Sequence, residues 1–448
     1  MRLLLTHGYF LADDAKEQHI VKPYPPLGIL YISSYLKARG FAVDVYDATF
    51  GSREELFGII DQNPGGVIGI YGNLMTRPNV LAIAERAHAV GWLVLLGGPE
   101  PTNYADEFLA SGADLIVAGE GEHAMEQLAR CEFQREFWPS IPGIIFRADD
   151  GKTIRTGPAE LIHDLDASPW PDREQVNIDR YLDAWRTRHG LGSVSIITAR
   201  GCPYKCNWCS HSVYGHTHRR RSPLKVVDEI EWILDRYRPE MLWIADDVFT
   251  IHYGWLQQYA AEMKRRGIRI PFECITRADR VNPSVAATLA ELGCMRVWIG
   301  SESGSQRILD AMQRGVTAEQ VRAAVALSRG NGIEVGMFLM WGYEGEELCD
   351  VEATIEHVKS CRPDVFFTTV SYPIKGTPYF DRVSPKIVRI KGWKESSDRE
   401  VAIRGRRSRR FYQCADELLR AEMERERDSS RVLAARRALE GAMDEVEA

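Results

Sequence analysis

The sequence predicts an α/β protein with an N-terminal Rossmann-like domain, a partial (β/α)6 barrel and a C-terminal helical region. Two observations support this fold class. Short apolar segments alternate with helical periods over residues 1 to about 130, and the same alternation resumes near residue 191 and repeats six times. Such alternation is typical of parallel sheets covered by helices. We place the domains at residues 1–135 (Rossmann-like), 136–190 (hairpin and Pro-containing linker), 191–385 (barrel) and 386–448 (helical region).

The first domain contains five short apolar segments separated by amphipathic ones. We expect parallel strands at 2–6, 42–47, 67–71, 93–96 and 115–118. In sheets of this kind, ligands bind beyond the carboxyl ends of the strands.

The connector begins with a hairpin signal. Residues 144–146 and 153–155 flank the turn sequence Asp149-Asp150-Gly151-Lys152. Pro169 and Pro171 then favour an extended crossing to the next domain.

The barrel and the C-terminal region follow from the remaining pattern. Six strands are expected at 193–198, 241–245, 269–275, 296–299, 334–339 and 365–370. A β/α barrel places its chemistry at the carboxyl ends of these strands. Residues 411–448 are rich in Glu, Arg and Ala and are expected to be helical.

The composition excludes several classes of protein. The net charge of −7 gives no electrostatic case for nucleic-acid binding. No apolar run approaches the length of a membrane span, and the N-terminus lacks a signal-peptide pattern. An odd number of cysteines, nine, argues for reduced thiols in place of a disulfide framework. We therefore expect a cytoplasmic protein that binds no nucleic acid and does not span a membrane.

Three cysteines form a compact motif directly after the first barrel strand. Cys202, Cys206 and Cys209 have the spacing C-x3-C-x2-C and are expected on a loop at the carboxyl end of that strand. Thiolates are the ligands of iron–sulfur clusters, and four normally complete a cubane. Three neighbouring cysteines would leave one iron of a 4Fe–4S cluster open to a ligand from outside the protein.

Zinc is the alternative metal for this motif. Cys206 and Cys209 could form a C-x2-C pair with His211, His216 or His218 as partners. This interpretation leaves Cys202 without a role, and no second C-x2-C pair follows.

The motif, with Trp208 before its last cysteine, resembles that of the radical S-adenosylmethionine (SAM) superfamily, and later segments match its landmarks. The resemblance implies that a residue after the second strand faces the methionine amine and that an arginine after the third pairs with the methionine carboxylate. It also implies ribose contacts after the fourth strand and an adenine contact after the fifth. The expected SAM-binding residues are Trp208, Asp246, Arg277, Glu302, Ser303 and Gly342. Trp341 and Tyr343 are larger than the residues usual beside the adenine.

The first domain resembles the cobalamin-binding domain that precedes the barrel in a large radical SAM subfamily. Glycine-rich turns at its predicted strand ends carry this resemblance, since glycine lets backbone approach a bulky ligand. No Asp-x-His-x-x-Gly segment is present, which implies cobalt without a protein nitrogen below it. The alternative is a domain that has lost its ligand. The expected cobalamin-binding residues are Leu27, Gly28, Met75, Thr76, Gly97, Gly98, Pro99, Glu100, Gly119 and Glu120.

The resemblance implies an enzyme that cleaves SAM reductively to a 5′-deoxyadenosyl radical. The favoured reaction is cobalamin-dependent C-methylation of an unactivated carbon in a small-molecule substrate. The alternatives are oxidative cyclisation, as in the anaerobic cyclase of bacteriochlorophyll synthesis, radical SAM chemistry without cobalamin, or a zinc-stabilised binding protein. An external one-electron donor such as flavodoxin or ferredoxin is implied. The sequence identifies no catalytic acid or base and no particular substrate.

Overall fold

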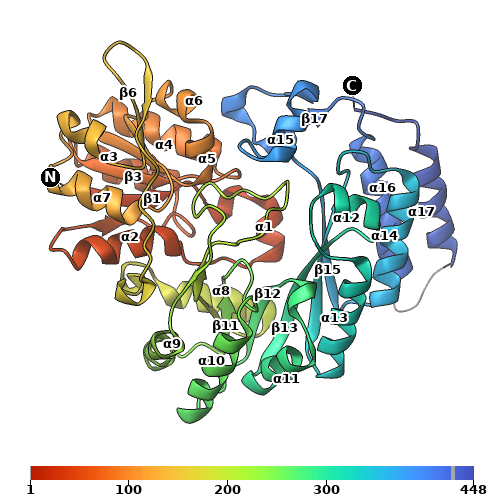
Figure 1. Cartoon of the computed structure of the whole chain (residues 1–448). Helices are drawn as coiled ribbons and strands as arrows, with labels where there is room; N and C mark the ends of the chain where they lie inside the picture. The colour runs from red at the N-terminus through yellow and green to blue at the C-terminus, as the bar shows by residue number, and fades with distance from the viewer. Residues whose placement is uncertain (1, 425–428, 448) are drawn as a thin grey trace. The chain divides into compact units, whose positions relative to one another are not determined.

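The computed structural model describes residues 2–424 and 429–447. Two compact units can be separated (Figure 1). Unit 1 comprises residues 1–203, 210–242 and 392–397, and unit 2 comprises residues 204–209, 243–391 and 398–448. The domain boundaries expected at 135, 190 and 385 remain an interpretation of the sequence pattern.

Unit 1 is built on a seven-stranded sheet with the order β2-β1-β3-β4-β5-β6-β7. The first five strands pair in parallel, as predicted, and the hairpin of β6 and β7 is also confirmed. This hairpin extends the sheet, because the apolar strand β6 pairs antiparallel with β5. The strands are β1 (Leu3–His7), β2 (Asp44–Val45), β3 (Val67–Tyr71), β4 (Leu93–Gly97), β5 (Leu115–Val117), β6 (Ile144–Arg147) and β7 (Thr153–Arg155).

Helices cover both faces of this sheet, so it is doubly wound. Leu3 and Leu5 of β1 belong to one apolar core with α2 and α7, whereas Leu4 belongs to a second core with α3, α4 and α6. The period of two along a strand explains this division. The helices of unit 1 are α1 (Ala15–Ile20), α2 (Leu27–Lys37), α3 (Arg53–Asp61), α4 (Arg77–Ala89), α5 (Pro99–Asn103), α6 (Ala105–Leu109), α7 (Gly121–Arg130), α8 (Ile178–His189) and α9 (Pro223–Tyr237).

The second large sheet has the order β15-β14-β13-β12-β11-β8, so that β15 and β8 are its edge strands. All six strands predicted for the partial barrel are present, and the pairs from β12 to β15 are parallel. β13 continues three residues past its predicted end. The strands are β8 (Ser193–Ile196), β11 (Met241–Ile244), β12 (Phe272–Thr276), β13 (Cys294–Glu302), β14 (Glu334–Trp341) and β15 (Val365–Val370), with two short antiparallel pairs, β9 (Ala199–Arg200) with β10 (Arg219–Arg220) and β16 (Ile387–Val388) with β17 (Ala402–Ile403).

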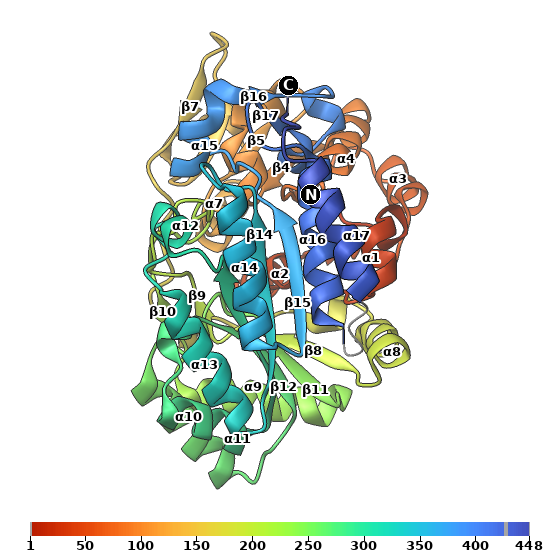
Figure 2. The ribbon, with the colours of Figure 1, turned by 90° about the vertical axis from the view of Figure 1, so that its right-hand side faces the viewer.

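The helices of unit 2 lie along these strands. α13 contacts β13 and β14, α16 contacts β15, and the predicted C-terminal helices α16 and α17 pack side by side (Figure 2). A capping box starts α13: the Thr317 hydroxyl accepts from the Gln320 amide, and the Gln320 side chain accepts from the Thr317 amide. The helices are α10 (Tyr253–Arg265), α11 (Pro283–Leu292), α12 (Gln306–Ala311), α13 (Ala318–Gly330), α14 (Leu348–Cys361), α15 (Pro378–Val383), α16 (Arg409–Met423) and α17 (Ser429–Gly441).

Candidate active site

The three-cysteine motif lies on a loop, as the sequence predicts, but this loop follows the short strand β9 and not the barrel strand β8 directly. Its members differ in exposure: Cys202 is half-buried, Cys206 is buried and Cys209 is exposed. Asn207 anchors the loop, because its amide N–H donates to Met312 O and its side-chain Nδ2 to Ala311 O, each over 3.0 Å. These bonds fix the second half of the motif against the end of α12.

Trp208 joins the apolar cluster around the end of α12. Its partly buried ring packs against a cluster that includes Met312, Met340 and Tyr343. This packing orients the turn between Cys206 and Cys209, which is closed by a 3.3 Å hydrogen bond from the Cys209 amide to Cys206 O. A contact between Trp208 and SAM remains a prediction.

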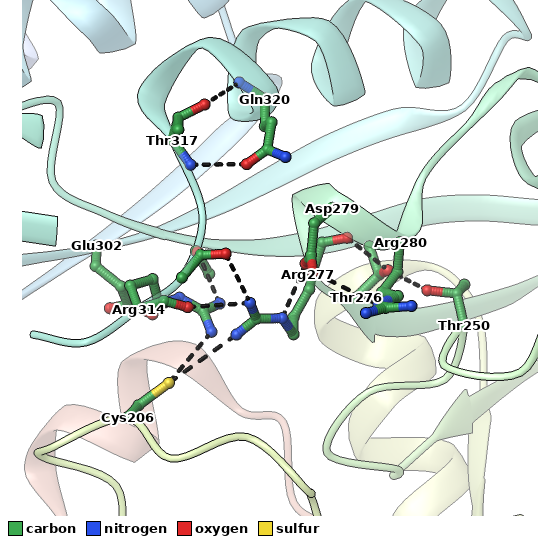
Figure 3. A network of polar contacts seen from close by, with 12 residues as sticks. Cys206, Thr250, Thr276, Arg277, Asp279, Arg280, Glu302, Arg314, Thr317 and Gln320 are labelled. Carbon is green, nitrogen blue, oxygen red and sulfur yellow. Dashed lines mark hydrogen bonds and ion pairs between the residues drawn. The ribbon is translucent and has the colours of Figure 1, made fainter. Parts of the chain in front are cut away.

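Two buried arginines approach the sulfur of Cys206 (Figure 3). Nη1 of Arg314 lies 3.6 Å from Cys206 Sγ, and Nη1 of Arg277 lies 4.0 Å from it. Arg277 is 2% exposed and Arg314 9% exposed, so both charges are removed from bulk water. Buried cations require anionic partners. A thiolate that ligates an iron–sulfur cluster is such a partner and accepts hydrogen bonds of this kind.

Arg314 is held in place by the end of β13. Its Nη2 donates to Gly300 O over 2.9 Å, and its Nε lies 4.0 Å from Glu302 Oε1. Burial alone would lower the pKa of Arg314, but the charges of Glu302 and Cys206 outweigh it and raise the pKa. The side chain therefore stays cationic beside Cys206.

Glu302, the residue expected at the ribose, has an unusual backbone conformation. It has φ of +63°, which is costly for a residue with a Cβ, and a β-bulge precedes it. Such strain concentrates at functional sites. The bulge directs the carboxylate toward Arg314, and burial raises the pKa of Glu302 although Arg314 and Arg277 oppose that rise.

Arg277 has several partners besides Cys206. Its Nε donates to Asp279 Oδ1 over 2.9 Å, and its Nη2 donates to Arg314 O over 3.0 Å. Its guanidinium also lies 3.6 Å from the ring centre of Tyr204, within the motif loop. The predicted role of Arg277 at the methionine carboxylate is untested, but the structure places its guanidinium beside the motif.

The other residues expected around SAM have different surroundings. Asp246 is buried after β11. The Ser303 hydroxyl lies 3.1 Å from the Thr354 hydroxyl of α14, so it joins β13 to that helix. The Gly342 amide donates to Glu346 Oε2 over 2.6 Å. The structure thus brings Arg277 and Glu302 together around Cys206, whereas Ser303 and Gly342 make contacts elsewhere in unit 2.

Two glutamates expected at cobalamin form buried ion pairs. Glu100 accepts from Nε of Arg77 over 2.6 Å and also from its Nη2. Glu120 accepts from Nη1 of Arg200 over 3.0 Å and from Nη1 of Arg219 over 2.7 Å. These carboxylates hold the loops after β4 and β5 in shape, and any ligand contact they make remains a prediction.

The other expected cobalamin residues lie at strand ends or at the starts of helices. Gly98 has φ of +100°, a conformation that favours glycine. Met75 is 46% exposed, whereas Thr76 is buried immediately before α4. Leu27 is the first residue of α2, followed by an exposed Gly28. The remaining three, Gly97, Pro99 and Gly119, are half-buried at the ends of β4 and β5.

Sequence analysis did not identify Arg314 or Tyr204 as site residues. Arg314 follows α12 in a segment without a motif, and its partner Cys206 lies 108 residues earlier. Tyr204 stands inside the cysteine motif, but nothing in the spacing predicts an arginine above its ring. An arginine followed by a glycine, as in Arg314-Gly315, is too common in sequences to indicate a site residue.

The side chains around the motif can be compared with the needs of the two metal groups that the sequence suggests, a zinc ion and a 4Fe–4S cluster. Within residues 2–424 and 429–447, no three His, Cys, Asp or Glu side chains form a group that could hold a single metal ion. A cubane differs, because each cysteine ligates a different iron and the sulfurs need not converge on one point. Three thiols with two guanidiniums at one sulfur fit a negatively charged cluster.

The chain matches two family descriptions. Residues 196–358 match the radical SAM superfamily, and residues 18–129 match the B12 binding domain. An uncharacterized methyltransferase of Pyrococcus horikoshii is 28% identical over 79% of this chain and 77% of its own length. The anaerobic magnesium-protoporphyrin IX monomethyl ester cyclase of Rubrivivax gelatinosus is 26% identical over 86% of this chain and 71% of its own.

Solved structures share the fold. The radical S-adenosylmethionine methyltransferase TsrM from Kitasatospora setae, with cobalamin and a 4Fe–4S cluster bound, aligns with a TM-score of 0.70. It is 20% identical, over 86% of this chain and 75% of its own. The cobalamin-dependent radical enzyme OxsB with aqua-cobalamin bound aligns with a TM-score of 0.74 and 18% identity, over 94% of this chain and 66% of its own. Among the described helices, none is long and apolar enough to cross a membrane.

Proposed function

Because the chain belongs to the radical SAM superfamily and carries a B12-binding domain, we propose that it methylates an unactivated carbon of a small molecule in a cobalamin-dependent reaction. The family resemblance inferred from the sequence is confirmed by these two matches, and so is the α/β fold. The chain is an enzyme, which argues against the alternative of a zinc-stabilised binding protein.

Cys202, Cys206 and Cys209 are the proposed ligands of a 4Fe–4S cluster. When bound, the cluster and SAM together supply a reductive cleavage that yields a radical able to remove hydrogen from carbon. Arg314 and Arg277 support this assignment, since their guanidiniums donate toward Cys206 Sγ and offset negative charge there. An external one-electron donor, such as flavodoxin or ferredoxin, belongs to the same proposal.

Arg277 and Glu302 are proposed to position SAM beside Cys206. A guanidinium can bind a carboxylate through two parallel hydrogen bonds, and a carboxylate can accept from two ribose hydroxyls. Arg277 lies 4.0 Å from the motif sulfur, and the bulge after Gly300 directs Glu302 toward the same network. This convergence at one buried cysteine is the observation that carries the radical SAM part of the proposal.

Unit 1 supplies the methyl-transfer part of the proposal. Cobalamin, when bound, supplies a methyl group attached to cobalt. The loops after β3, β4 and β5 lie at the carboxyl edge of a doubly wound sheet, where ligands of such folds bind. The printed names of several relatives support methylation, among them the bacteriochlorophyllide d C-12(1)-methyltransferase of Chlorobaculum tepidum and the hopanoid C-3 methylase of Methylococcus capsulatus.

Cyclisation is the second candidate, because the Rubrivivax gelatinosus cyclase matches 86% of this chain. Product analysis separates the two. The full chain would be reconstituted anaerobically with iron, sulfide and cobalamin, then incubated with SAM and a reductant. Methylation consumes one SAM as methyl donor and one as radical source, so S-adenosylhomocysteine and 5′-deoxyadenosine should both form. Deoxyadenosine alone, with the true substrate present, would favour cyclisation.

A further inference from the structure

The Glu302 side chain comes from a strained turn at the end of β13. The partners of Gly300 and Glu302 on β14 are consecutive residues, so Ser301 is the extra residue of the β-bulge. The Ser303 amide donates to Ser301 O over 2.8 Å, which makes Glu302 the central residue of a γ-turn. Because φ of Glu302 is +63°, this is the rare and strained form of that turn. Such strain persists only where neighbouring structure holds it in place.

The structure that holds this turn is a polar stripe on one face of α14. The stripe consists of Asp350, Thr354 and His357, whose spacing of four and three residues puts them on the same side of the helix. Their exposed fractions are 4%, 0% and 3%. Buried polar groups require hydrogen-bond partners. The segment 301–305 supplies partners to all three.

Thr354 is the central residue of the stripe. Its hydroxyl donates to Asp350 O over 2.9 Å, so the Ser303 hydroxyl, 3.1 Å away, is the donor in the contact between the two side chains. The Gly304 amide donates to the same Thr354 oxygen over 3.0 Å. The Ser303 oxygen in turn accepts from the Ser305 amide over 3.1 Å. The Ser303 hydroxyl is therefore engaged by its own segment and by α14.

The two ends of the segment are held in the same way. Nε2 of His357 lies 3.1 Å from Ser301 Oγ, and Nη1 of Arg322 lies 3.3 Å from His357 Nδ1. An arginine can only donate, so Nδ1 accepts and Nε2 carries the proton that Ser301 receives. Burial lowers the pKa of His357 to about 4, and the charge of Arg322 adds to this effect, so the imidazole is neutral. At the other end, the Ser305 hydroxyl donates to Asp350 Oδ1 over 2.6 Å.

Gly304 lets the segment lie directly against α14. A Cβ at this position would be 2.4 Å from Ala353 O and 2.5 Å from His357 Cβ. Glu302 has different surroundings, because its carboxylate lies 4.0 Å from Arg314 Nε in the network shown in Figure 3. The serines of the segment thus contact the helix, whereas its glutamate faces the network around the cysteine motif.

We propose that the polar stripe of α14 positions Glu302 for SAM, with Thr354 as the residue that fixes the turn. In this arrangement Ser303 supports the turn through Thr354 and does not itself contact the ribose. The inference rests on the proposed function, in which Glu302 accepts hydrogen bonds from ribose hydroxyls, and it gives a positioning role to residues that do not touch SAM.

Ligand binding tests the proposal without turnover. The probes are S-adenosylhomocysteine and its 2′,3′-dideoxy analogue, which lacks both ribose hydroxyls. Equilibrium dialysis measures their affinity for the full chain, reconstituted anaerobically with iron and sulfide. Thr354→Val should weaken binding of S-adenosylhomocysteine about tenfold, the loss expected when a hydrogen bond to a charged group is misplaced. Binding of the dideoxy analogue should stay at the parent value, because that analogue has no hydroxyl for Glu302 to accept from.

Three further variants show how the loss arises. Thr354→Ser keeps the hydroxyl and should retain the parent affinity. Thr288→Val is the matched control, because that buried hydroxyl lies on α11, donates to Ser284 O and accepts from Gln257. Ser303→Ala should weaken binding as Thr354→Val does, and it provides the same test should Thr354→Val not fold. The double variant should bind no more weakly than either single variant, because both remove the same contact.

Equal weakening of both probes by Thr354→Val would overturn the positioning role, and so would additive losses in the double variant. Additive losses would indicate that Ser303 contacts the ribose itself.

Glu302→Gln separates a failure of this inference from a failure of the proposed function. It should weaken binding of S-adenosylhomocysteine and not of the analogue, whether or not α14 positions the side chain. A Glu302→Gln variant that binds both probes as the parent does would contradict the proposed role of Glu302, and this inference with it. Because S-adenosylhomocysteine has no methyl group to transfer, the result does not depend on whether the enzyme methylates its substrate.

Discussion

Nη1 of Arg314 lies 3.6 Å from Sγ of Cys206, although the two residues are 108 positions apart in the chain. Arg277 approaches the same sulfur, so two buried guanidiniums lie beside one thiol. Hydrogen bonds to ligand sulfurs and nearby charge are determinants of the reduction potential of an iron–sulfur cluster. These arginines therefore offer a direct test of the proposed cluster.

Replacing Arg314 by Gln should lower the reduction potential of the cluster. Reduction adds negative charge, and the variant lacks a cation that stabilises that charge. We expect a shift on the order of 50 mV, since 59 mV corresponds to a tenfold change in a one-electron equilibrium. A redox titration followed by electron paramagnetic resonance measures it. Arg280→Gln is the control, because Arg280 is half-buried and pairs with Asp279. An equal shift in both variants would contradict a specific role for Arg314.

Removing all three motif thiols should abolish the cluster and leave the fold intact. The sulfurs of Cys202, Cys206 and Cys209 lie on a loop, and their replacement by Ala removes no strand or helix. We expect iron and sulfide to fall to background after anaerobic reconstitution, with an unchanged circular dichroism spectrum. The exposed Cys349, replaced in the same way, should leave the iron content at its full value. Iron retained by the triple variant would refute the ligand assignment.

A second buried ion pair should matter for the stability of unit 1. Arg77 is fully buried, donates to Glu100, and also donates to the carbonyl oxygens of Trp393 and Ser396 over 3.1 and 2.7 Å. Arg77→Ala would leave Glu100 buried without its cation, a loss that typically costs about 3–5 kcal/mol. Urea denaturation measures the change. The exposed pair of Arg86 with Asp61 provides the control, and Arg86→Ala should change stability little.

The fold was more predictable from the sequence than the contacts between side chains that lie far apart in the chain. Apolar segments with a strand or helix period identify buried elements wherever they occur, and all six barrel strands were placed. β13 ran past its predicted end because Gly300 and Ser301 carry no apolar signal. The contact between Arg77 and Trp393 spans 316 residues, and only the folded chain brings such groups together. Ser303 matched a family landmark, but whether its hydroxyl faces α14 depends on χ1, which a sequence does not reveal.

Glu346 should make folding stability depend on pH. Burial raises the pKa of Glu346 to about 8, although the hydrogen bond from the Gly342 amide lowers this pKa. Between the ordinary carboxyl pKa and about 8 the folded protein holds a proton that the unfolded chain has lost. Stability contributed by this group is therefore present at low pH and declines as pH rises through that window, by about 1.4 kcal/mol per pH unit.

Glu346→Gln should remove this slope, because an amide remains neutral throughout. Urea midpoints measured from pH 5 to pH 8 for both proteins would show the parent curve falling more steeply. Glu352→Gln, on the exposed side of α14, should retain the parent slope. A variant curve parallel to that of the parent would show that Glu346 titrates normally.

The last prediction concerns the lower face of cobalt in the proposed cobalamin site. Unit 1 carries one histidine on α4, His88, and one on α7, His123. The side chain of His88 is 59% exposed near Asp114, and His123 lies 3.8 Å from Glu160. His7, buried at the end of β1, has Nε2 3.0 Å from the Asp47 carboxylate and accepts from the Tyr9 amide at Nδ1. Each of these three imidazoles has a carboxylate neighbour within unit 1.

Protein purified with cobalamin available should therefore bind one corrinoid per chain in a base-off form. Electron paramagnetic resonance of the Co(II) state should lack nitrogen superhyperfine splitting, because the chain has no Asp-x-His-x-x-Gly segment to supply an imidazole below the metal. Splitting that disappears in His123→Ala but persists in His88→Ala would identify His123 as the ligand and contradict the prediction. If no corrinoid binds under any condition, methyl transfer from cobalt is excluded and radical chemistry without cobalamin replaces it. The spectrum decides this without a known substrate, since the measurement requires only the loaded protein.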